Sequence, residues 1–118
     1  MSAWRLLVRL AFWATCLAAF VLAVMPAPPE LWVSDKLQHA FAFLVLAGLG
    51  WCAYPAVRKR WLLVGLMAFG ALIEIVQALP IVGRDSDPLD WVADSAAALT
   101  VFVIVALWTY YRRNHPDG

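Results

Sequence analysis

Charged residues are scarce in this chain of 118 residues. They make up 14% of the sequence, whereas 64% is hydrophobic. Soluble domains have about 25% charged and about 45–50% apolar residues. Because a chain this small buries only part of its surface, the apolar residues exceed what an internal core can hold. The composition excludes an ordinary water-soluble fold and intrinsic disorder, and the surplus apolar surface is expected to face lipid.

Other classes are excluded by what is missing. The net charge is only +1, so no general attraction to nucleic acid is expected. Glycine does not recur with a period, which excludes a collagen-like chain, and no segment alternates apolar and polar residues as the strands of a transmembrane barrel do. The two cysteines, Cys16 and Cys52, fall at different depths of different apolar segments. We therefore expect no disulfide between them.

Four apolar stretches are present, and each is close to the roughly 20 residues that a membrane-spanning helix needs. Prolines follow the first three, while Ser34 and Asp87 are suited to cap the second and fourth. A cleaved signal peptide is the alternative for the first stretch, although no clean cleavage site follows it. We predict an all-α integral membrane bundle of four transmembrane helices in one domain, residues 1–118. The helices are expected over about 4–25, 35–54, 61–79 and 88–111.

The basic residues are distributed unevenly among the connections. Only Lys36 and Arg84 fall on one side of the predicted bundle. The other seven, on the side of both termini, are Arg5, Arg9, Arg58, Lys59, Arg60, Arg112 and Arg113. Because positive residues are retained in the cytoplasm, both termini are predicted to be cytoplasmic in a multi-pass protein of the cell (inner) membrane. The connections 26–34 and 80–87 are then on the outer side.

Three ionisable residues are expected inside the predicted spans at similar depth. At 1.5 Å per residue, His39 lies ~6 Å and Glu74 and Asp94 lie ~7.5 Å below the outer boundary. A charged side chain near the bilayer centre costs roughly 2.5–3.5 kcal/mol, so partners are expected. We predict that His39, Glu74 and Arg84 form one polar cavity in the outer half. The structural alternatives are a packing contact for Glu74 and a helix cap for Asp87.

The order of these residues resembles the VanZ-like family over about residues 35–98. The motifs are an Asp-Lys-x-x-His opening at 35–39, a Glu-x-x-Gln at 74–77, and a Gly-Arg loop at 83–84 before a helix that carries an acid. The resemblance implies a small multi-helix membrane bundle. It also implies importance for Asp35, Lys36, His39, Glu74, Gln77, Arg84 and Asp90. The chain departs from the family at Asp94, where Asn is usual, and at Ala97, where Gly is usual.

We therefore predict a VanZ-like protein with an acidic outer-half site that acts on or binds a lipid-linked component of the cell envelope. The candidate catalytic residues are His39 and Glu74. The candidate substrate-binding residues are Asp35, Lys36, Gln77, Arg84, Asp90 and Asp94. The alternatives are a non-enzymatic membrane scaffold and a cation-binding or permeation module. The sequence assigns no metal ligands and no cofactor, although a divalent ion held by carboxylates and His39 is left open. The expected partners are the lipid bilayer and a lipid-linked precursor.

Overall fold

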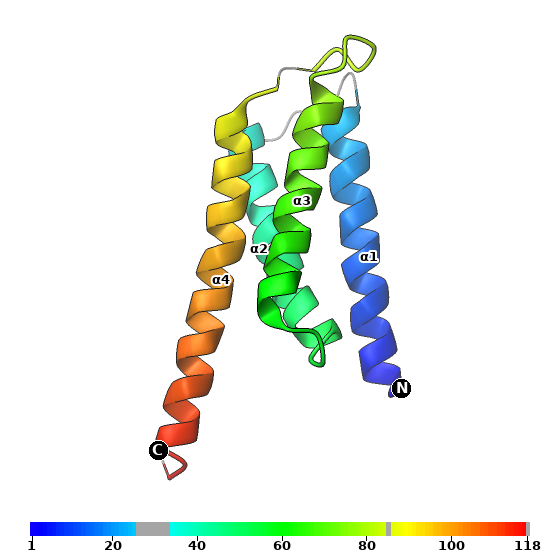
Figure 1. Ribbon diagram of the computed structural model, residues 1–118. Coiled ribbons are helices and arrows are strands. Elements are labelled where there is room, and N and C mark those ends of the chain that lie inside the picture. The colour runs from blue at the N-terminus through cyan, green and yellow to red at the C-terminus, as the bar shows by residue number, and fades with distance from the viewer. Residues whose placement is uncertain (26–33, 85, 118) are drawn as a thin grey trace.

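The computed structural model describes residues 1–25, 34–84 and 86–117, apart from the side chain of Asp35. In this part of the chain it contains four α-helices and no strand (Figure 1). They are α1 (Ala3–Val24), α2 (Asp35–Ala53), α3 (Lys59–Gln77) and α4 (Pro88–Asn114). The predicted all-α architecture is confirmed. All four helices are long and apolar enough to span a membrane.

The helix starts follow the capping residues. The Ser34 hydroxyl accepts a hydrogen bond from the Leu37 amide (3.3 Å), and the Asp87 carboxylate accepts one from the Leu89 amide (2.9 Å). Both predicted caps are therefore confirmed. The ends differ from the prediction by a few residues. Helix α3 begins at Lys59, two residues early, because charged side chains are tolerated in an exposed first turn. Helix α4 continues to Asn114, three residues further than predicted.

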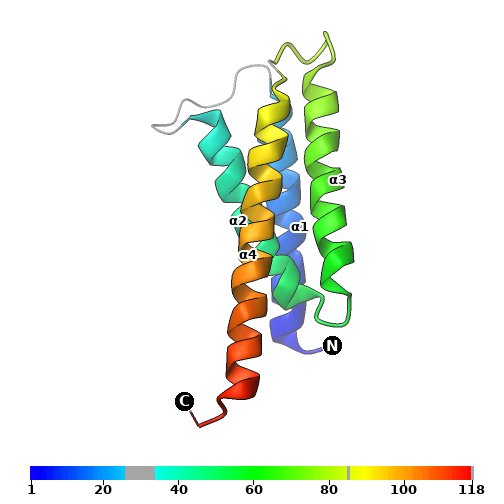
Figure 2. The same cartoon turned by 60° about the vertical axis from the view of Figure 1, so that its left-hand side comes forward.

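The helices pack in the order α1, α2, α4, α3 around the bundle, with α2 and α3 also in contact across its middle. Within the described ranges, α1 and α4 do not contact each other. Both termini lie at one end of the bundle (Figures 1 and 2). We call the opposite end, where α1 and α3 end and α2 and α4 begin, the distal end.

The core lies along α2 and the faces that surround it. Phe43, Leu46 and Ala47 of α2 are 0–2% exposed, and Ile73 of α3 is 2% exposed. Ala98 of α4 is fully buried beside them. Small residues at these levels let the helices approach closely.

The outer surface of the bundle is apolar. No more than 28% of the apolar window of any span is buried inside the bundle. On α1 alone, Leu10, Trp13 and Leu17 are about 60% exposed. Such a surface is unfavourable in water and suits a hydrocarbon environment. These are the features of a multi-pass membrane protein. Both cysteines are free, as expected.

Candidate functional site

Three helices bring ionisable side chains together at the distal end. His39 lies one turn into α2, Glu74 lies near the end of α3, and Asp90 lies in the first turn of α4. One potential ligand atom from each of the three lies within 4.8 Å of the other two. We call these three residues the distal cluster. Of the three residues predicted to share one cavity, His39, Glu74 and Arg84, the first two lie in this cluster.

Glu74 uses one carboxylate oxygen to position a loop. Its side chain is buried, and its Oε2 accepts a hydrogen bond from the Asp87 amide (3.1 Å). The Ser86 hydroxyl lies 2.9 Å from Oε2 and 3.0 Å from the Glu74 carbonyl oxygen, so it can donate to either. The other oxygen, Oε1, is buried and has no hydrogen-bond partner among the described residues. Oε2 of Glu74 therefore has a structural role, whereas Oε1 is left to interact with a bound group.

Two further polar groups at this site lack partners. Within the described part of the chain, the buried Nδ1 of His39 and both carboxylate oxygens of Asp94 have no hydrogen-bond partner. Asp94 is only 1% exposed, and its carboxyl group interacts electrostatically with those of Asp90 and Glu74. Buried polar groups are usually hydrogen-bonded. The concentration of unpaired groups in one place sets this end of the bundle apart from an ordinary packing contact.

Lys36 supplies positive charge beside the cluster. Its Nζ lies 3.7 Å from Oδ2 of Asp87 and 3.7 Å from Oδ1 of Asp90, and its side chain is 46% exposed. These ion pairs connect the start of α2 to the start of α4. Because the ammonium group is accessible and not tightly hydrogen-bonded, it can interact with an anion that approaches from the distal end.

Two residues predicted for the site donate hydrogen bonds to the end of α1. The Nε2 of Gln77 donates to the carbonyl oxygen of Ala23 (2.8 Å). The Nη1 of Arg84 donates to the carbonyl oxygens of Leu22 (3.1 Å) and Met25 (2.9 Å). The last carbonyls of a helix have no intrahelical partners, and they carry the negative end of its dipole. Both side chains thus cap the C-terminal end of α1, which is a structural task.

The structure also identifies residues that the sequence analysis missed. Ser86 holds Glu74 in place, and its position directly before a helix cap was the only signal. Trp91 donates from its indole Nε1 to the carbonyl oxygen of Met67 (2.8 Å) and joins α4 to α3 just below the cluster. The side chain of Asp35, a predicted site residue, lies outside the described residues.

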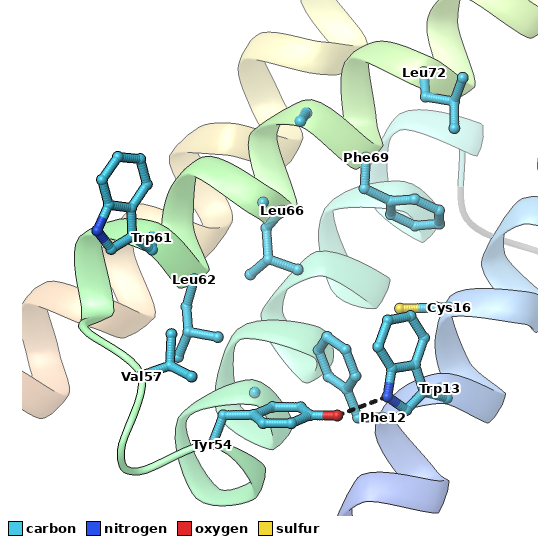
Figure 3. Close-up of a pocket in the computed structure, with 13 residues that line it drawn as sticks. Phe12, Trp13, Cys16, Tyr54, Val57, Trp61, Leu62, Leu66, Phe69 and Leu72 are labelled. Carbon is cyan, nitrogen blue, oxygen red and sulfur yellow. Dashed lines mark hydrogen bonds between the residues drawn. The ribbon is translucent and has the colours of Figure 1, made fainter.

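A large groove lies elsewhere, between α1 and α3 (Figure 3). Its volume is about 520 Å³, and its lining includes Phe12, Leu66 and Phe69. The Trp13 indole nitrogen and the Tyr54 hydroxyl at its edge hydrogen-bond to each other (2.8 Å). This lining is apolar and contains no acid or base, so the groove suits hydrocarbon chains and not a polar ligand.

The distal cluster therefore combines an imidazole with two carboxylates, a set that can transfer protons or bind a cation. Comparison with known proteins adds no assignment, since the chain matches no protein-family model, no curated protein and no solved structure. The resemblance to VanZ-like proteins stays a prediction.

Proposed function

We propose that this chain is a VanZ-like membrane protein that binds the anionic headgroup of a lipid-linked cell-envelope component at its distal end. Both termini are cytoplasmic in this proposal, and the distal end faces the outer side of the membrane. His39 and Glu74 form the pair available for proton transfer to or from the bound headgroup.

The observation that carries this proposal is the distal cluster itself. Each ionisable residue in a membrane span makes insertion less favourable, by roughly 2.5–3.5 kcal/mol near the bilayer centre. Three helices nevertheless each contribute one such residue to the same place, where their ligand atoms lie within 4.8 Å. A bundle that needed only to pack would be more stable with apolar residues at these positions. Retained ionisable groups within spans are characteristic of functional sites.

Lys36 and the surrounding bilayer supply the features that a lipid ligand requires. The half-exposed ammonium group can pair with a phosphate or carboxylate of the headgroup. The apolar outer faces of the helices are open to the hydrocarbon tail. A soluble anion would use only the ammonium group, whereas a lipid with an anionic headgroup would use both the ammonium group and the apolar helix faces.

The experiment is mass spectrometry of lipids that copurify with the full-length protein in mild detergent. We expect one phosphate-bearing, long-chain species to be enriched over the membrane extract. In Lys36→Met, which keeps an extended side chain but removes its charge, that species should fall at least tenfold. Arg84→Lys is the matched control, because it changes a cation that caps α1, and it should retain the lipid. Equal lipid content in wild type and Lys36→Met would refute the proposal.

A membrane scaffold is the second candidate, and the groove between α1 and α3 favours it. An apolar groove of about 520 Å³ can receive a hydrocarbon chain or side chains of a neighbouring helix. A scaffold of this kind does not use the charge of Glu74. In Glu74→Gln, the amide oxygen can still accept from the Asp87 amide, so folding should survive. Full complementation of an envelope phenotype by this variant would favour the scaffold, and loss would favour the polar site.

A further inference from the structure

We infer that the distal cluster binds a divalent first-row metal ion, with Zn²⁺ the preferred ion, through His39, Glu74 and Asp90. This inference does not rest on the proposed lipid ligand, because metal binding can be measured on protein freed of lipid. It assigns a chemical role to buried side-chain atoms that have no hydrogen-bond partner among the described residues.

The donor set has the composition of a metal site with open coordination positions. Zinc centres that keep a fourth position for water or substrate have three protein ligands, and imidazole nitrogen and carboxylate oxygen are both zinc ligands. Imidazole favours Zn²⁺ over the harder ions Mg²⁺ and Ca²⁺, which prefer sets made entirely of oxygen. The three residues come from three helices, which a bound ion would join at the distal end.

The spacing is close to what a common ion needs. At zinc–ligand bonds of about 2.0 Å, tetrahedral ligand atoms lie about 3.3 Å apart. The three donor atoms lie within 4.8 Å of one another without an ion. Rotations of the half-buried His39 and Asp90 side chains can close this difference. Glu74 is held in place by the Ser86 and Asp87 contacts to its Oε2, so it provides a fixed point for the site.

The unpartnered atoms are independent support. Glu74 is 8% exposed, and its Oε1 has no hydrogen-bond partner among the residues that the structure describes. The same holds for Nδ1 of His39 and for both oxygens of Asp94, which is one helical turn further along α4 from Asp90. A buried carboxylate without compensation is strongly unfavourable. A divalent cation in the cluster compensates the charges of Glu74 and Asp90 directly and that of Asp94 through the electrostatic field.

The charges around the cluster also favour binding of a cation. Lys36 pairs with Asp87 and Asp90, and the Asp94 carboxyl group interacts electrostatically with those of Asp90 and Glu74, so four carboxyl groups lie in or beside the cluster. This excess of acids attracts a cation. A bound divalent ion would add positive charge beside Lys36 for a phosphate oxygen, which is compatible with the proposed headgroup. Lys36 competes with the ion for Asp90, so its removal should strengthen metal binding.

The test uses full-length protein in detergent, with Cys16→Ser and Cys52→Ser introduced so that no thiol contributes. The protein is stripped with EDTA, freed of lipid and titrated with Zn²⁺ against a chromophoric chelator. Bound zinc is counted by mass spectrometry after desalting. We expect one ion per chain, and His39→Gln, Glu74→Gln and Asp90→Asn should each weaken binding at least tenfold. A parallel titration with Mn²⁺ should give weaker binding that depends on the same residues.

The chain offers a matched control. His115→Gln removes the only other histidine, which is exposed beyond the end of α4. This variant should bind zinc as the parent does. Lys36→Met should bind zinc more tightly while losing the lipid, so failure of the proposed function and failure of the metal site are distinguishable.

A second readout needs no variant. Zn²⁺ at 100 times its dissociation constant should raise the unfolding temperature reversibly, since ligands that bind only the folded state stabilise it. EDTA should reverse the shift. The inference is overturned if zinc binds no more tightly to the parent protein than to a His39→Gln, His115→Gln double variant. It is also overturned if binding is lost in His115→Gln alone.

Discussion

Asp94 shows most directly how the site affects stability at the level of single residues. Its side chain is 1% exposed, and neither oxygen has a hydrogen-bond partner in the described part of the chain. Asp94→Asn keeps the shape and removes the charge. We expect metal-free protein to gain about 1 kcal/mol of stability, measured by thermal unfolding in detergent.

The stability gain of Asp94→Asn should disappear when zinc is added, because a bound cation offsets the charge of the wild-type carboxylate. Asp94→Leu serves as the comparison, since it removes the polar group altogether. A lower unfolding temperature for metal-free Asp94→Asn would contradict this account, and would mean that the carboxylate makes a stabilising contact.

Arg84 gives a second prediction at this scale. Its Nη1 donates to two carbonyl oxygens at the end of α1, a role that a Lys ammonium group can also fill. Arg84→Ala should lower stability by about 1–2 kcal/mol, while Arg84→Lys should retain most of it. Thermal unfolding of both variants measures this. If Arg84→Lys unfolds as early as Arg84→Ala, the guanidinium geometry matters and the simple cap is refuted.

The sequence predicted how deep the polar side chains lie along their helices, but not which neighbouring helix each one contacts. Counting residues from the helix ends placed His39 and Glu74 at one level, and the structure brings them together because their helices are neighbours. Gln77 shares a helical face with Glu74 but bonds α1. Which neighbour a helix face meets depends on the order of helices around the bundle. That order is set by packing, which the spacing of residues along one helix does not encode.

At the level of helices, Gly70 determines how closely α3 and α4 approach. A Cβ atom at this position would lie 3.2 Å from Cδ1 of Trp91 and 3.4 Å from Cζ of Phe43. Gly70→Val should therefore destabilise the bundle by about 1–3 kcal/mol through overpacking. Gly65 is the matched control on the same helix, because an added Cβ there meets nothing within 4 Å. Gly65→Val should be tolerated.

Thermal unfolding and size-exclusion elution of the two glycine variants provide the measurement. Gly70→Val is expected to unfold earlier and to weaken the Trp91–Met67 hydrogen bond, which tryptophan fluorescence can follow. Equal behaviour of the two variants would show that the α3–α4 contact is looser than described. The small residues of these helices were visible in the sequence, but the aromatic ring that uses the space at Gly70 was not.

At the level of the whole molecule, the position of both termini at one end allows a test of orientation. Ile81 at the distal end is 90% exposed, and Ala56 lies in the exposed connection at the other end. In a chain without native cysteines, Ile81→Cys should react with an impermeant thiol reagent added to intact cells. Ala56→Cys should react only after the membrane is opened. The opposite pattern would reverse the proposed orientation.

The capping of α1 by Gln77 and Arg84 has a consequence for biogenesis. The donors for the carbonyl oxygens at the end of α1 lie 54 to 62 residues further along the chain. Because the chain is made from its N-terminus, α1 is synthesised before either donor. Until α3 arrives, water or lipid headgroups must bind these carbonyls. Capping of the end of α1 is thus a late step of assembly, and a nascent chain arrested before Gln77 holds α1 without its final cap.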